Sequence, residues 1–97
     1  MIRYNRPNLK RLETLFKELE YTVRYEKGNF QSGYCVVEDR RIAVINKFYD
    51  VEGRINCLLD ILSQQDVTPY LADMSEASLK LFKAIEDGLA AREGEEE

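Results

Sequence analysis

The sequence has no histidine and no tryptophan, and it contains only two cysteines and two prolines in 97 residues. Without imidazole the chain has no Ser-His-Asp or Cys-His nucleophile pair, no HExxH zinc motif and no histidine pH switch. Any catalytic step would have to rely on Asp, Glu, Lys, Tyr or Cys side chains. These absences favour a protein that is not an enzyme, and we expect no cofactor.

Long apolar runs are also missing. The longest, such as 42–45, contain four residues, whereas a helix that spans a membrane needs about 20. Residues 1–9 are polar and basic, unlike the apolar centre of a secretory signal peptide. We therefore expect a cytoplasmic protein without a membrane partner.

The two cysteines, Cys35 and Cys57, lie inside apolar periodic segments and form no CxxC motif. In a reducing compartment such residues usually act as small buried hydrophobic side chains. Two thiolates without histidine would also leave a zinc site two ligands short. We therefore predict that both cysteines are packed in the core, and we keep Cys35 as a candidate reactive thiol.

The composition is that of one globular domain. The chain is 44% hydrophobic and 33% charged, with five glycines. Roughly 100 residues are enough for a single hydrophobic core. We predict one domain over 1–92, followed by an acidic disordered tail over 93–97.

Apolar residues at helical spacing predict two amphipathic helices on either side of the central part of the chain. The first spans 8–20, with Pro7 and Asn8 at its start. The second spans 51–64 and begins after Asp50, whose carboxylate can cap the free amides of its first turn.

A third helix is predicted to begin near Asp73 or Ser75. Asp73 and Glu76 have the spacing of a capping box at this point. The helix is expected to bury four apolar residues: Leu79, Phe82, Ile85 and Leu89.

Three segments between the first two helices have strand character: 21–25, 33–37 and 41–46. The first alternates apolar and polar residues, and the other two are rich in β-branched residues around the charged stretch 38–41, which favours a tight hairpin. We therefore predict an α+β fold of order α-β-β-β-α-α, in which helices pack on a three-stranded antiparallel meander.

The second and third predicted strands are apolar on both faces, since Tyr34 and Val36 alternate with Cys35 and Val37. Both faces of the sheet should then be covered, because a large exposed apolar patch usually marks an interface. The first two helices can cover one face. For the other face two alternatives stay open: the third helix, or a second copy of the chain in a homodimer.

Charge is unevenly distributed in a chain whose net charge is −4. Residues 1–47 contain ten basic and six acidic side chains, whereas residues 48–97 contain four basic and twelve acidic ones. No known motif for DNA or RNA binding accompanies the basic half, and the net acidity repels phosphate. We expect no nucleic-acid partner and a role for the charge asymmetry in contacts between proteins.

The loop 27–33 has more glycine and amide residues than a minimal turn needs. It lacks the GxGxxG and GxxxxGK patterns that cradle phosphates. Since loops on a rigid scaffold often carry binding, we select four candidate binding residues: Asn29, Phe30, Gln31 and Tyr34.

About half of the chain resembles a small bacterial family of uncharacterised proteins. The matching segments are ELEYTVRYEKGNF at 18–30, SGYC at 32–35, VINK at 44–47 and EGRI at 52–55. The resemblance implies an α+β domain and supplies no activity, cofactor or catalytic residue.

A second resemblance is to the frame of minimal zinc peptidases that cleave phage repressors. In that family a helix and a small sheet, whose last strand ends in Ile-Asn, lead through an arginine into a helix that carries HExxH. Ile45, Asn46 and Arg54 match this frame, but Leu59 and Ser63 stand at the two histidine positions. The resemblance therefore implies a non-catalytic relative with a vacant metal motif.

Two functional hypotheses follow. The first is a non-enzymatic cytoplasmic domain that binds a protein partner or itself. The alternative is a small-molecule or metal-binding protein, or an enzyme, that uses Tyr25, Tyr34, Cys35 and nearby carboxylates in a cleft beside the loop 28–33.

Overall fold

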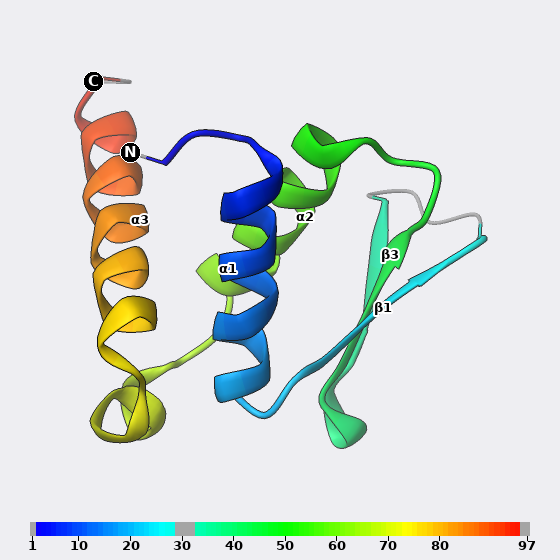
Figure 1. Cartoon of the computed structure of the whole chain (residues 1–97), viewed down its shortest axis with the longest axis horizontal. Coiled ribbons are helices and arrows are strands. Elements are labelled where there is room, and N and C mark those ends of the chain that lie inside the picture. Colours follow the sequence, from blue (N-terminus) through cyan, green and yellow to red (C-terminus); the bar gives the residue numbers. More distant parts are fainter. Residues whose placement is uncertain (1, 29–32, 96–97) are drawn as a thin grey trace.

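The computed structural model in Figure 1 describes residues 2–28 and 33–95, with side chains as far as residue 88. The elements are α1 (Arg6–Glu18), β1 (Thr22–Glu26), β2 (Tyr34–Val37), η1 (Glu38–Arg40), β3 (Ile42–Asn46), α2 (Val51–Ser63), η2 (Thr68–Asp73) and α3 (Glu76–Glu95). The predicted α+β class and the order of its helices and strands are confirmed. The two short 3-10 helices, η1 and η2, were not predicted, because segments of three to six residues have no measurable apolar period.

Helix α1 begins two residues before the predicted start. Asn5, not Asn8, is its N-cap: the Asn5 side chain accepts a hydrogen bond of 3.0 Å from the Asn8 amide. Pro7 fits inside the first turn, because the amide it lacks has no partner there. Asn8 instead donates its side-chain amide to the carbonyl of Arg3 at 2.8 Å.

Helix α2 is capped as predicted, since Asp50 Oδ1 accepts a hydrogen bond of 2.8 Å from the Gly53 amide. Helix α3 was predicted to begin near Asp73 or Ser75, and the capping by Asp73 is wrong. Asp73 ends η2, and it is the Ser75 hydroxyl that accepts a hydrogen bond of 3.2 Å from the Ser78 amide. Helix α3 then runs to Glu95, into the stretch 93–97 for which a tail was predicted.

The predicted antiparallel meander is wrong. The sheet is mixed and has the order β1-β3-β2, in which β3 pairs parallel with β1 and antiparallel with β2. Only the hairpin between β2 and β3, closed by η1, follows the prediction. Strand β3 is apolar on both faces and takes the centre, whereas β1 carries Thr22, Arg24 and Glu26 on one face and lies at an edge.

Helices α1 and α2 cover one face of the sheet, and α3 lies on the far side of α1 (Figure 1). The core between these layers consists largely of the apolar stripes of α1 and α2 and the inward side of β3: Leu9, Leu12, Leu15, Phe16, Leu19, Ala43, Ile45, Ile55, Leu58, Ile61 and Leu62. Helix α3 therefore packs on α1 as a further layer and does not cover the second face of the sheet.

Of the two alternatives left open for the second sheet face, cover by the third helix is thus excluded for the described chain. The face that α3 turns inward agrees with the predicted one in part, since Ile85 is buried as predicted. Ser78, Leu81 and Ile85 are buried, whereas Leu79 and Phe82 are half-buried. The fourth predicted residue, Leu89, lies outside the described side chains. Ser78, on the buried side of α3, donates a hydrogen bond to Glu18 of α1.

The helices that the structure describes include none that is both long and apolar enough to cross a membrane.

Candidate functional site

The predicted binding loop is only partly described. Three of its candidate residues lie outside the described part of the chain: Asn29, Phe30 and Gln31. The last loop residue, Gly33, has a left-handed φ of +85° and packs against the ring of Tyr49 so closely that a Cβ atom would overlap it. The end of the loop is therefore held against the segment between β3 and α2.

Tyr34 connects the edge strand β2 to α2. Its hydroxyl donates a hydrogen bond of 2.6 Å to Asp60 Oδ2 and accepts one of 3.2 Å from Gln64 Nε2. The bond to the carboxylate, followed by partial burial, raises the pKa of the Tyr34 phenol. Tyr34 therefore stays protonated at neutral pH and acts as a donor to Asp60.

Tyr25 connects the other edge strand, β1, to α1. Its hydroxyl donates to the Glu13 carboxylate, and the Arg54 guanidinium lies 4.3 Å from the centre of its ring. Burial first, and the bond to Glu13 second, raise the pKa of Tyr25. In the sheet register Tyr25 and Tyr34 flank Ile45 on the same, helix-covered face.

Cys35 lies on the opposite face of the sheet from Tyr25 and Tyr34. In β2 the half-buried Tyr34 and Val36 alternate with the exposed Cys35 and Val37. The three residues of the alternative hypothesis therefore cannot line one cleft. The prediction that Cys35 is buried is also wrong, because no helix or loop in the described part of the chain covers its face.

Cys57 is buried in α2, as predicted. Burial, together with the nearby Asp60 carboxylate, raises the pKa of the Cys57 thiol, which makes it a poor nucleophile. Among the described residues, no group of three or more Cys, Asp or Glu side chains is arranged to hold a metal ion.

The uncovered sheet face has an apolar centre and a charged edge. We call it the open sheet face; it comprises Thr22, Arg24 and Glu26 of β1, Cys35 and Val37 of β2, and Ile42 and Val44 of β3. Val37 is 40% exposed, and Arg24 pairs with Glu26 at 3.1 Å along the edge strand. This face therefore presents apolar side chains beside charges of both signs.

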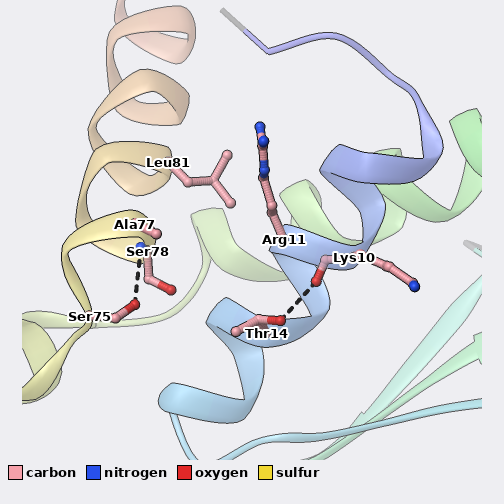
Figure 2. Close-up of a pocket in the computed structure, with 7 residues that line it drawn as sticks. All are labelled: Lys10, Arg11, Thr14, Ser75, Ala77, Ser78 and Leu81. Carbon is pink, nitrogen blue, oxygen red and sulfur yellow. Dashed lines mark hydrogen bonds between the residues drawn. The ribbon is translucent and has the colours of Figure 1, made fainter.

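A second surface feature lies between α1 and α3 (Figure 2). Two adjoining cavities of about 170 and 520 Å³ share three lining residues, Arg11, Ala77 and Leu81, and so form one groove. Leu81 and Arg11 project into the space between the two helices, whereas the side chain of Lys10 turns away from α3. The remaining residues of the groove are Ile2, Arg3, Asn8, Thr14, Ser75, Ser78, Lys80 and Ala84.

The lining of this α1–α3 groove includes cations and no carboxylate among the described residues. Within the described chain the one ion pair joins Arg24 and Glu26, so Arg3, Arg11 and Lys80 have no acidic partner. Sequence reasoning noted the basic N-terminal half, but Lys80 lies far along the chain, and only the packing of α3 on α1 brings it to the groove.

Glu18 of α1 is hydrogen-bonded to two residues of the groove lining, Ser75 and Ser78. Its carboxylate accepts hydrogen bonds from the Ser75 amide at 2.6 Å, from the Ser75 hydroxyl at 3.0 Å and from the Ser78 hydroxyl. These bonds, with that of Ser78 first, hold the pKa of Glu18 below its usual value. Glu18 thus caps α3 from α1 and is not available to a ligand of the groove.

Comparison with known proteins gave no match among protein-family models, curated proteins or solved structures. Function must therefore be inferred from the open sheet face, the α1–α3 groove and the tyrosine networks.

Proposed function

We propose that this chain is a non-enzymatic cytoplasmic protein-interaction domain and that its open sheet face binds a second copy of the chain. The observation that carries this proposal is the apolar centre of that face, formed by Cys35, Val37, Ile42 and Val44, which the described helices leave uncovered. Burial of such side chains gains about 25 cal/mol per Å² of apolar surface.

The charges beside the apolar centre favour a second copy as the occupant. Arg24 and Glu26 carry opposite signs on the same edge strand, 3.1 Å apart. When two copies of this edge meet, each charge can face one of opposite sign, so the like-charge repulsion that would oppose self-association is absent.

The size of the face limits the strength of the dimer. Three strands about 4.8 Å apart, with five residues in β1 and β3 and four in β2, span roughly 220 Å² at about 3.3 Å per residue. Stable complexes bury about 800 Å² per partner. We therefore expect a weak dimer that forms only at high protein concentration.

The tyrosine networks support a role without catalysis. Tyr25 and Tyr34 each donate to a carboxylate and have a raised pKa, so neither is a general base near neutral pH. On α2, at the positions that the zinc peptidase resemblance assigns to histidines, Leu59 packs against the core and the Ser63 hydroxyl donates to the Asp60 carbonyl. Neither side chain is an ordinary zinc ligand.

The cysteines support a cytoplasmic setting. Both are free thiols, and Cys35 is exposed. An exposed thiol persists most readily in a reducing compartment, because an oxidising one would pair it with another thiol.

The test is sedimentation equilibrium over about 10 µM to 1 mM protein. We expect an average mass that rises with concentration from 11.3 kDa toward twice that value. Val44→Glu places a carboxylate in the centre of the face and should abolish the rise, whereas the near-isosteric Val44→Thr should retain part of it. Asn56→Glu adds the same charge on an exposed position of α2 and serves as the control. A constant mass of 11.3 kDa for the unmodified chain up to 1 mM would contradict the proposal.

A further inference from the structure

We infer that the α1–α3 groove is a binding site for an acidic segment of a partner protein. This site is separate from the open sheet face, since α1 and α2 lie between them (Figure 1). The inference rests on the groove's shape, its apolar wall and the sign of its charges.

The groove is elongated and open to one side. On α3 its lining runs from Ser75 to Ala84, which at 1.5 Å per residue is about 14 Å. Leu81 and Ala77 form an apolar wall along α3 that faces α1 (Figure 2). An open groove of this length fits a short stretch of peptide better than a compact small molecule.

The charges in the groove have one sign. Arg3, Arg11 and Lys80 come from the N-terminal segment, α1 and α3, and none forms an ion pair with a described carboxylate. The guanidinium of Arg11 has only a neutral partner, the Asn8 side chain at 3.1 Å. Cations spread along the groove match carboxylates spread along a peptide rather than a single compact anion.

A second copy of the groove cannot be the occupant, because two basic grooves repel each other. Nucleic acid is disfavoured as well, because the described lining has no aromatic side chain on which a base could stack. The acidic residues elsewhere weaken the attraction of an acidic peptide only modestly, since salt screens charges beyond about 8 Å at physiological ionic strength.

The experiment uses fluorescence anisotropy with the full chain and two labelled octapeptides, acidic EELEELEE and basic KKLKKLKK, in which the leucines can contact the apolar wall. We expect saturable binding of the acidic probe at low salt, weaker binding as salt rises, and no saturable binding of the basic probe. Amide chemical shifts should change along α1 and α3 and not along β2 and β3.

Two basic residues supply the matched variants. Arg11 of α1 projects into the groove (Figure 2), whereas Lys83 of α3 lines neither cavity. Arg11→Glu should raise the Kd of the acidic probe at least tenfold, and Lys83→Glu, with the same change in net charge, less than twofold. Both positions are exposed, and circular dichroism checks that both variants are folded.

Three results would overturn the inference. The first is an absence of saturable binding of the acidic probe at 1 mM protein in low salt. The second is equal weakening by Lys83→Glu and Arg11→Glu, which would mean that the peptide responds to the charge of the whole chain and not to the groove. The third is a pattern of chemical shift changes centred on the sheet, which would place the peptide at another surface.

Discussion

The contact between Glu18 and the start of α3 is expected to be a main stabilising link between α3 and the rest of the fold. We consider Glu18→Gln, which removes the charge and keeps the shape of the side chain. The carboxylate accepts three hydrogen bonds, from the Ser75 amide, the Ser75 hydroxyl and the Ser78 hydroxyl. In the variant an amide group that cannot accept a hydrogen bond replaces one acceptor oxygen. Water cannot readily replace the bond lost by Ser78, because Ser78 is only 4% exposed.

Hydrogen bonds to a charged group contribute about 1.5–3 kcal/mol each, and neutral ones about 0.5–1.5. The remaining side-chain oxygen of the glutamine can still accept a neutral hydrogen bond. We therefore expect Glu18→Gln to lower the free energy of unfolding by about 2 kcal/mol at pH 7. For a chain of this size that corresponds to a fall in Tm of roughly 8–16 °C. Urea denaturation followed by circular dichroism measures the change directly.

The effect should depend on pH with a defined sign. The pKa of Glu18 is below its ordinary value of 4.5 in the folded protein, chiefly because of the bond from Ser78. A lowered folded-state pKa stabilises the protein above the unfolded value, and that contribution is lost as pH falls through the folded value. The difference in stability between the unmodified chain and Glu18→Gln should therefore be full at pH 6 and shrink below about pH 4.5.

Two further variants make the prediction refutable. Glu76→Gln removes a charge from the first turn of the same helix without touching the serine hydroxyls, so it isolates the effect of the helix dipole. A double-mutant cycle of Glu18→Gln with Ser78→Ala should show a coupling of about 1 kcal/mol. If Glu18→Gln costs no more than Glu76→Gln, or if its cost is the same at pH 3 and pH 6, the assigned role of Glu18 is wrong.

Three other predictions concern the sheet, the thiols and the core. Gly33→Ala should destabilise the fold by about 1–3 kcal/mol, since φ is +85° and the new methyl group overlaps the Tyr49 ring; chemical denaturation measures the loss, and unchanged stability would contradict the geometry. A thiol reagent should label Cys35 rapidly and Cys57 only on unfolding, given their exposure; equal rates in the native protein would refute this. Leu12→Ala should cost about 2–5 kcal/mol, because Leu12 is fully buried; a loss below 1 kcal/mol would mean that α1 packs differently.

The elements that were predicted well are those whose signal is local. The apolar stripes of α1 and α2 repeat at helical spacing, and Asp50 caps α2 whatever the helix packs against. The β2–β3 hairpin was also predictable, because its strands are joined by a short charged turn. By contrast, the position of β1 depends on which strand it meets after the loop 27–33, and nothing in its own residues specifies that.

The candidate sites were harder to predict for the same reason. Tyr34 was selected as a loop residue, yet its partner Asp60 is on α2. Cys35 was placed in one cleft with Tyr34, although alternation along a strand, a local rule, already puts them on opposite faces. The link from Glu18 to Ser78 crosses 60 residues of chain, and no spacing rule detects such a pair.

The sequence by itself determined the class of the fold, the helices and strands in their order, and the absence of histidine chemistry, because each of these depends on composition or on short-range periodicity. Only the tertiary structure decided that β3 lies between β1 and β2, that α3 packs on α1 and leaves the open sheet face uncovered, and that Lys80 joins Arg3 and Arg11 in one groove. Those features depend on which surfaces meet after the chain collapses, and the free energy of such contacts is shared between residues far apart in the sequence.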